Sequence, residues 1–285
     1  ANNNISINSI TGDVLWNSPK QEGEYNIAIL ITEYRNGIVV GSMIRDMQII
    51  VLDHTNDPPD IKEINDTCVV AGSTLLKTIH ASDINGDSVL LDGSGGPLEF
   101  GTNPATFPDA GSTSSTSSIF EWVTSCEDIR RNPYSIIFKA KDNYSPGWMQ
   151  SAPLTDLETW RIWVVAPSPK NVITDPNMNN IKVSWDSLYQ CSGANHFKGF
   201  SVWRKEGSNP FTFDTCETGL AGKGYSKIAD NITNYSYLDE NLDRGKSYCY
   251  RVLAHFSLGT TDFPYNQTTS LPSNEACKEL KQDIP

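Results

Sequence analysis

The sequence predicts an all-β chain built from tandem β-sandwiches. Short runs in which apolar and polar residues alternate recur along the chain, and clusters of Gly, Pro, Asn and Asp separate them. This pattern is typical of strands joined by turns, whereas helical periodicity is scarce. The length of 285 residues leaves room for two or three domains. An apolar content of 38% favours several small cores over one large core.

An internal repeat organises the first part of the chain. Tyr25 and Tyr134 begin alternating strands about 109 residues apart, and an apolar-x-Trp step precedes each of them, at Trp16 and Trp122. Another alternating strand follows in both copies. We therefore assign residues 1–58 to the C-terminal part of one sandwich and residues 59–166 to a second sandwich.

The two copies differ in length before the shared tyrosine. The second has about 75 residues between Pro59 and Tyr134, whereas 24 residues precede Tyr25. We expect the first copy to lack its first half, which leaves sheet edges unpaired, and the natural polypeptide to continue upstream. Residues 92–118 are rich in Gly, Ser, Thr and Pro, so we expect a long exposed loop inserted in the second sandwich.

Residues 167–285 carry a different pattern. Trp185 closes one alternating strand, and Leu242 and a turn at residues 243–245 precede a strand that begins with Tyr248 and Tyr250. This segment resembles a fibronectin type III domain, with Tyr248 at the position of that family's tyrosine corner. The resemblance implies a third β-sandwich.

The six cysteines predict disulfides. Their number is even, and they form no CxxC pair and no zinc-like spacing with histidine, which favours three disulfides in an oxidising compartment. On the fibronectin resemblance, Cys249 and Cys277 lie on adjacent strands and form a pair. Our working assignment joins the others as Cys191 with Cys216 and Cys68 with Cys126, one of fifteen possible pairings.

The junction between the first two repeats suggests calcium. The sequence Asp53-His54-Thr55-Asn56-Asp57-Pro58-Pro59 resembles the cadherin interdomain linker, and the segments 81–87 and 140–146 resemble two further cadherin elements. The resemblance implies cadherin-like, immunoglobulin-like sandwiches for residues 1–166. It also implies a calcium site, since calcium collects six to eight oxygens. Its ligands would be Asp53, Asn56, Asp57, Asp83, Asn85 and Asp142. The alternative is that these residues only build turns.

Charge and motifs exclude several classes of function. A net charge of −12 opposes binding to nucleic acid. The longest apolar run is far shorter than a membrane-spanning helix, so we expect no membrane span. No phosphate loop, metal-binding histidine pair or nucleophile motif occurs, and the four histidines are isolated, which predicts a protein that is not an enzyme.

Three longer segments resemble a more specific class of protein. The segments EYNIAILITEYRNGIVVGSMIRDMQIIVLD, CSGANHFKGFSVWRKEGS and SNEACKELKQDIP look like modular regions of large gliding-motility-associated surface proteins exported by the type IX secretion system. This resemblance implies contact with that secretion machinery and a place outside the cell, at the outer cell surface. We expect a structural or adhesive spacer. The alternatives are a module that binds a surface glycan or protein, and an accessory region of a secreted hydrolase.

Overall fold

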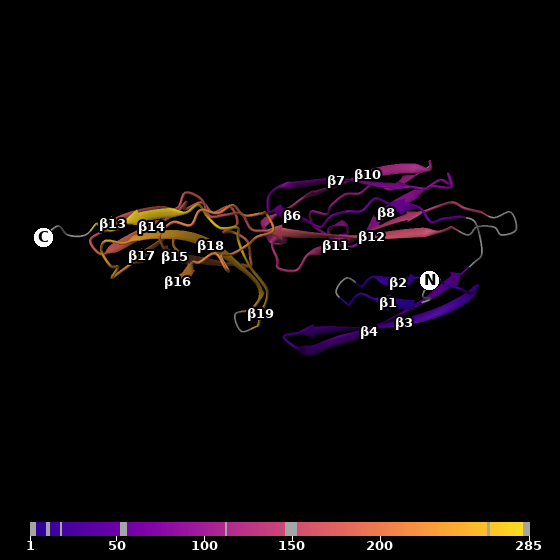
Figure 1. The fold of residues 1–285 in the computed structure, drawn as a ribbon, viewed down its shortest axis with the longest axis horizontal. Helices are drawn as coiled ribbons and strands as arrows, with labels where there is room; N and C mark the ends of the chain where they lie inside the picture. Colours follow the sequence, from indigo (N-terminus) through magenta and orange to yellow (C-terminus); the bar gives the residue numbers. More distant parts are fainter. Residues whose placement is uncertain are drawn as a thin grey trace. The chain divides into compact units, whose positions relative to one another are not determined.

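The computed structural model describes residues 4–9, 12–17, 19–51, 56–111, 113–145, 153–260 and 263–281. It confirms the all-β prediction, because strands dominate these residues (Figure 1). Their helical elements are two short 3-10 turns, η1 (Gly96–Glu99) and η2 (Cys126–Asp128). In the described part of the chain, no helix has the length and apolar character needed to cross a membrane. The chain divides into two compact units, residues 1–56 and 57–285.

The first unit consists of two antiparallel hairpins. Strand β1 (Asn4–Ile7) pairs with β2 (Val14–Asn17), and β3 (Gly23–Arg35) pairs with β4 (Ile38–Val51). Asn36 and Gly37 link β3 to β4, with φ angles of 51° and 79°. A two-residue type I′ turn requires positive φ at both positions, and this turn matches the twist of a long hairpin.

Two sheets form the second sandwich, with strand orders β10-β7-β5 and β6-β12-β11-β8-β9. Alternate residues of its central strands are fully buried between the sheets, as in Phe138 and Trp160. The strands are β5 (Asp60–Ile61), β6 (Thr67–Val70), β7 (Thr74–Ser82), β8 (Leu90–Ser94), β9 (Ala110–Gly111), β10 (Ser115–Val123), β11 (Tyr134–Lys141) and β12 (Thr155–Val165).

The predicted internal repeat is confirmed by equivalent contacts in the two units. The rings of Trp16 and Tyr25 meet edge to face with centroids 4.7 Å apart, and those of Trp122 and Tyr134 meet in the same way at 5.1 Å. The long hairpins also share a register, because the tyrosine lies opposite an isoleucine in both β3–β4 and β11–β12. Strands β2, β3 and β4 therefore correspond to β10, β11 and β12.

Residues 92–118 are more ordered than the long exposed loop we expected. The segment contains the end of β8, the turn η1, the short strand β9 and the start of β10. Pro97 and Ala105 are buried, and Phe100 and Phe107 pack against the core. The reason is that a few apolar residues within this polar, Gly-rich segment anchor it to the sandwich. The overall amino-acid composition of the segment, on which our expectation rested, does not reveal such individual anchors.

The third sandwich also has two sheets. Their strand orders are β13-β14-β17 and β16-β15-β18-β19, and β20 pairs with β18. The strands are β13 (Ile173–Asn177), β14 (Asn180–Ser184), β15 (Phe197–Glu206), β16 (Ser226–Ile232), β17 (Ser236–Asp239), β18 (Ser247–Gly259), β19 (Pro264–Thr269) and β20 (Ala276–Glu279).

The local features expected from the fibronectin resemblance are present. The Tyr248 hydroxyl accepts a hydrogen bond from the Asp243 N–H at 3.1 Å and donates to the Asp243 carbonyl at 3.4 Å, as in a tyrosine corner. Trp185 is buried and packs edge to face on Phe200. The predicted disulfide between Cys249 and Cys277 is confirmed, because these residues lie opposite one another on β18 and β20.

Candidate functional site

Two disulfides cross from the second sandwich to the third. Cys68 is bonded to Cys216, and Cys126 is bonded to Cys191, with Cα atoms 5.3 Å apart in each pair. Our assignments of Cys68 to Cys126 and of Cys191 to Cys216 are therefore wrong. Each had kept a pair within one sandwich, whereas the observed pairs form only because the two sandwiches dock end to end.

The four cysteines come from separate elements at this junction. Cys68 lies on β6 and Cys126 opens η2, both in the second sandwich. Cys191 lies in the turn after β14, and Cys216 lies in the long insertion between β15 and β16. Together with the peptide link near residue 166, the two sandwiches have three covalent connections. Three such points restrict both bending and rotation of one sandwich against the other.

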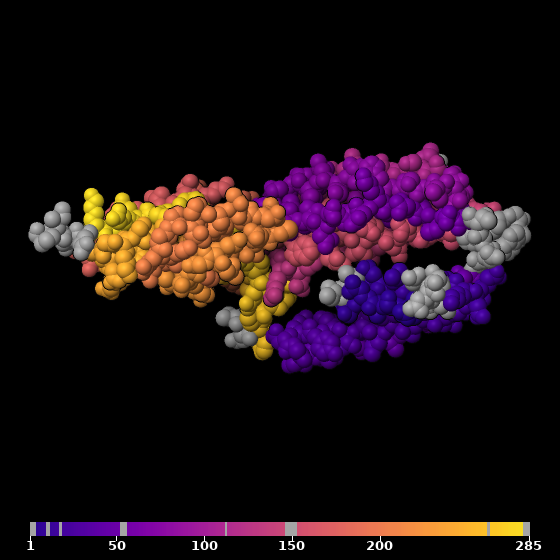
Figure 2. All heavy atoms as spheres, viewed as in Figure 1, coloured from indigo at the N-terminus to yellow at the C-terminus, as the bar shows by residue number. Residues whose placement is uncertain are grey.

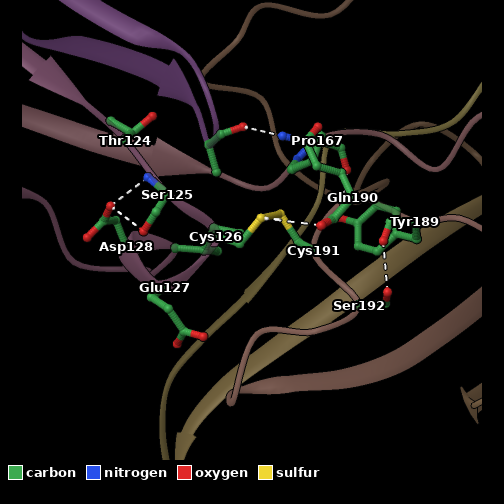
Figure 3. Close-up of a disulfide and its surroundings, with 12 residues drawn as sticks. Thr124, Ser125, Cys126, Glu127, Asp128, Pro167, Tyr189, Gln190, Cys191 and Ser192 are labelled. Atoms are coloured by element: carbon green, nitrogen blue, oxygen red, sulfur yellow. Dashed lines mark hydrogen bonds between the residues drawn. A yellow bond between two sulfur atoms is a disulfide. The ribbon is translucent and has the colours of Figure 1, made fainter. Parts of the chain in front are cut away.

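Polar contacts surround the disulfide of Cys126 and Cys191 (Figure 3). The Ser125 N–H and hydroxyl donate to the Asp128 carboxylate at 2.7 and 2.8 Å, a capping box that holds η2 in place. The Gln190 side chain donates to the Ala71 carbonyl at 3.4 Å. These contacts bring main-chain and side-chain groups of both sandwiches against the sulfur bridge.

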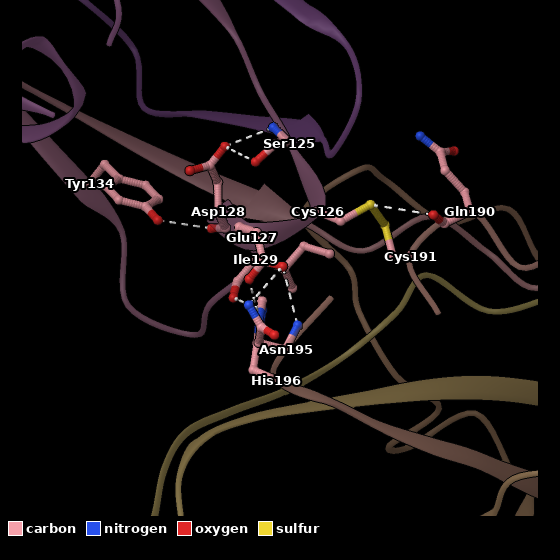
Figure 4. A network of polar contacts seen from close by, with 10 residues as sticks. All are labelled: Ser125, Cys126, Glu127, Asp128, Ile129, Tyr134, Gln190, Cys191, Asn195 and His196. Carbon is pink, nitrogen blue, oxygen red and sulfur yellow. Dashed lines mark hydrogen bonds and ion pairs between the residues drawn. A yellow bond between two sulfur atoms is a disulfide. The ribbon is translucent and has the colours of Figure 1, made fainter. Parts of the chain in front are cut away.

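Glu127 and His196 form a second set of contacts across the junction (Figure 4). Glu127 Oε1 accepts from the Asn195 N–H at 3.1 Å, and Glu127 Oε2 lies 3.5 Å from His196 Nδ1. His196 is buried, and its Nε2 lies 2.8 Å from the Ile129 carbonyl oxygen, so this nitrogen carries the donated proton. The junction thus pairs buried polar groups instead of leaving them unsatisfied.

The peptide link between the two sandwiches is itself buried. Val165 and Ala166 are buried, and the Ala166 carbonyl accepts from the Leu271 N–H at 3.0 Å. The Tyr189 hydroxyl donates to the Pro167 carbonyl at 2.8 Å. The two sandwiches of the second unit abut directly (Figure 2). A buried, hydrogen-bonded link of this kind differs from the exposed linkers that allow domains to move independently.

The insertion that carries Cys216, residues 207–225, packs back on the third sandwich. Leu220 and Tyr225 are buried against Leu253, and Phe211 packs on the same small cluster. Arg251 is buried beneath this insertion, with its guanidinium carbon 4.5 Å from the centre of the Phe211 ring. The insertion is thus anchored by its own apolar residues as well as by its disulfide.

Glu275 accepts hydrogen bonds from both ends of this insertion. Its carboxylate accepts from the Ser208 hydroxyl at 2.7 Å, from the Asn209 N–H at 3.1 Å, and from the Tyr225 hydroxyl. Burial alone raises the pKa of Glu275, but these hydrogen bonds and the charge of Arg251 outweigh burial and bring its pKa below the ordinary value of 4.5.

This lowered pKa predicts that the insertion loosens in acid. Because the folded pKa lies below the unfolded one, the carboxylate contributes stability that is present above the unfolded pKa and is lost as pH falls through the folded pKa. We expect Glu275→Gln to lower the free energy of unfolding at pH 7 by about 1 to 2 kcal/mol. We expect the difference from wild type to shrink in urea titrations at about pH 3. Glu279→Gln, an exposed change at the end of β20, the strand that follows Glu275, is the matched control. A pH-independent deficit would contradict the assignment.

Three loops that carry Asp57, Asp83 to Asp87, and Asp142 lie close together in the second sandwich, and we call them the acidic loops. Asp83 Oδ1 accepts from the Asn85 N–H at 2.8 Å and from the Asp87 N–H at 3.1 Å, and Asn85 Oδ1 accepts from the Asp57 N–H at 2.8 Å. Asp142 Oδ1 accepts from the Leu154 N–H at 2.8 Å. These contacts are those of turn-building side chains. Desolvation and the negative charges of Asp83 and Asp142 raise the pKa of Asp87.

The expected calcium ligands are brought together only in part. Asp53 lies outside the described residues, and Asn56 is the last residue of the first unit. Within the described residues, the acidic loops do not bring ligand atoms of three Asp, Glu, His or Cys residues within 4.8 Å of one another. The one group that meets this criterion is Cys249, Glu275 and Cys277, whose sulfurs are already joined in a disulfide.

One atom in the acidic loops has no hydrogen-bond partner. Asp83 is 8% exposed, and its Oδ2 is buried without a donor in the described part of the chain. A buried carboxylate oxygen in this state is costly unless a cation neutralises it. The residues therefore fit a hard cation. Sequence reasoning missed Asp87 as part of this cluster, although it lies in the motif that we quoted at residues 81–87.

A shallow groove of 630 Å³ is lined mainly by the third sandwich, including His255 and Asp230, and also by Arg131 of the second sandwich. His255 Nε2 lies 2.6 Å from the Ser201 hydroxyl and 3.8 Å from Asp230. Burial lowers the pKa of His255, against the attraction of Asp230. In a nucleophilic triad, the acid orients one ring nitrogen and the serine uses the other. Here serine and acid face the same nitrogen, and Ser201 is fully buried, so this cluster is structural.

Comparisons with known proteins give no family. No protein-family model matches the chain, and no curated protein matches it in sequence. Among solved structures, a crystal structure of titin domains is 14% identical over 98% of this chain and 83% of that chain, with a TM-score of 0.30. A cytokine receptor complex is 12% identical over 79% of this chain and 98% of that chain, with a TM-score of 0.33. The fold description rests on the strand topology given above.

Proposed function

We propose that this chain is a non-enzymatic structural and adhesive spacer of a larger secreted protein. The observation that carries the proposal is the junction between the second and third sandwiches, where two disulfides and a buried peptide link fix the two sandwiches together. Such a junction suits a part that transmits force or holds distance. Disulfides of this number also favour an oxidising compartment outside the cytoplasm.

The finer part of the proposal comes from the sequence resemblance. It places the chain outside the cell, at the outer cell surface, as a segment of a gliding-motility-associated protein exported by the type IX secretion system. The acidic surface supports this setting, because a net charge of −12 keeps a displayed module soluble and away from anionic surfaces.

The spacer role predicts that the two sandwiches tumble as one body. We expect nitrogen-15 relaxation of the intact chain to report equal rotational correlation times for β11 and β18. Replacing all four junction cysteines with serine should make those times diverge, because only the peptide link and polar contacts would remain. The control is Cys249→Ser with Cys277→Ser, which removes a disulfide within the third sandwich. Unequal correlation times in the oxidised wild type would contradict the proposal.

We further propose that the acidic loops of the second sandwich bind calcium. Asp57, Asp83, Asn85, Asp87 and Asp142 would supply oxygen ligands, and the buried Asp83 Oδ2 supports a cation there. Bound calcium would neutralise repelling carboxylates and stiffen the loops. With few carboxylates, we expect affinity in the range of about 10⁻⁴ to 10⁻³ M.

Calcium titration tests this site. At tenfold excess over the dissociation constant, calcium should stabilise the wild type by about 1.4 kcal/mol, read as a rise in melting temperature that a chelator reverses. Asp83→Asn keeps an oxygen to cap the Asn85 and Asp87 N–H groups but removes the charge, so it should abolish the calcium response. The exposed Asp109→Asn should keep it. If wild type and Asp83→Asn respond alike to calcium, the residues only build turns.

A further inference from the structure

The two copies of the repeat differ at one edge of the long hairpin. In the second sandwich, β11 pairs with β12 on one side and with β8 on the other. In the first unit, the equivalent β3 pairs with β4, and no other described strand of that unit pairs with it. The outer edge of β3 thus presents backbone donors and acceptors where the complete copy has a strand.

Apolar side chains are exposed at the same edge. A cavity of 720 Å³ lies in the first unit, lined by Ile5, Ile7 and Val14 and by the consecutive residues 27–32 of β3. Ile31 is 46% exposed, and Ile27 and Ile29 on the same face are only partly buried. The equivalent positions of β11 are Ile136, Phe138 and Ala140, and all three are 0% exposed.

The complete copy shows what buries these positions. Leu91 of β8 lies opposite Ala140 and is fully buried, and Gly93 lies opposite Phe138. A side chain at Gly93 would meet the rings of Phe107 and Phe138 at 2.8 and 3.2 Å. In the first unit, the smaller Ile29 stands where the second has Phe138, so the partner strand there has room for a side chain.

We propose that the first unit is a strand acceptor that is completed by a β-strand from the same polypeptide. This strand would run antiparallel to β3, with apolar residues alternating inward to fill the cavity, as β8 does for β11. The strand order of the complete copy decides its source. Strand β8 precedes β10 and β11 in sequence, and only six residues separate β1 from β2, too few to add a strand between them, so the completing strand lies N-terminal to β1. Main-chain pairing and alternate apolar side chains are the recognition mode of strand addition.

The test compares two lengths of the chain by hydrogen exchange. One is residues 1–285, and the other extends it at the N-terminus by the segment in which the proposal places the completing strand, over a length equal to residues 57–105. We expect β3 amides to exchange roughly tenfold more slowly or better in the longer chain. Binding of a dye for exposed apolar surface should fall in parallel.

Two substitutions in the longer chain give matched controls. Ile29→Asp places a charge in the cavity and should return β3 exchange to the rate of the shorter chain. Ala28→Asp, on the exposed neighbouring position of the same strand, should keep the protection. Equal β3 exchange in the two lengths would overturn the proposal. So would a dimer of residues 1–285 that already protects β3, because a second copy would then be the occupant.

Discussion

Stretching the oxidised chain from its two ends is expected to leave the residues between Cys68 and Cys216 unextended. This disulfide closes a loop with a sequence separation of 148 residues, and the bond between Cys126 and Cys191 lies wholly inside that loop. Force applied at the ends therefore passes from Cys68 to Cys216 through the sulfur bridge. Most of the second sandwich is shielded from tension. At about 3.4 Å per extended residue, the disulfide prevents roughly 500 Å of chain from being extended by the applied force.

Force spectroscopy on cysteine variants measures this shielding. Replacing Cys68 and Cys216 with serine should release about 280 Å of extra length, because the inner loop of 65 residues stays closed. Replacing all four junction cysteines should release the full ~500 Å. The wild type, handled identically, is the reference. An unchanged maximum extension in the first variant would contradict the nested arrangement of the two disulfides.

Removing the Asp239 carboxylate is expected to destabilise the third sandwich strongly. Asp239 is 5% exposed, and its two oxygens accept from Arg204 Nη1 at 3.1 and 3.0 Å and from the Tyr250 hydroxyl at 2.8 Å. Without it, the partly exposed guanidinium of Arg204 and the fully buried hydroxyl of Tyr250 lose their acceptor. Breaking such a pair costs about 3 to 5 kcal/mol, and the partial exposure of Arg204 places the expected loss near 3 kcal/mol.

Urea unfolding of Asp239→Ala measures this loss. Asp175→Ala, at an exposed position on β13, is the control and should stay within about 0.5 kcal/mol of wild type. Tyr250→Phe should cost about 1 kcal/mol, since it removes one hydrogen bond and leaves the ion pair intact. A loss below 1 kcal/mol for Asp239→Ala would mean that water replaces the carboxylate and that the network adds little.

Local patterns in the sequence predicted features that depend on neighbouring residues. The alternation around Tyr25 and Tyr134 identified matching strands, and the hairpins β3–β4 and β11–β12 have the same register at these tyrosines. The resemblance of residues 167–285 to a fibronectin type III domain predicted the tyrosine corner at Tyr248. These features were predictable because a turn and its two flanking strands lie within about 30 residues, so that the period of two already specifies which side chains face inward.

Features that join distant segments were not predictable in this way. Pairing Cys68 with Cys216 requires β6 to contact an insertion of another sandwich. The alternation of apolar residues within a strand does not predict which other sandwich the strand will contact. The same holds for Phe100 and Phe107, whose burial depends on a core built by other strands. For Asp83, the sequence suggested either a turn or a ligand, and only the structure shows that its Oδ2 is buried without a hydrogen-bond donor among the described residues.

The amino-acid sequence alone predicted a series of β-sandwiches with a repeated hairpin, and a resemblance to fibronectin type III domains supplied the expectation for the third module. It could do so because strand period, turn residues and aromatic spacing are short-range. Tertiary structure alone decided that two disulfides join the second and third sandwiches. Cys68 and Cys216 come together only where the surfaces of these sandwiches meet in space, and that outcome is set by the combined packing of residues more than a hundred positions apart.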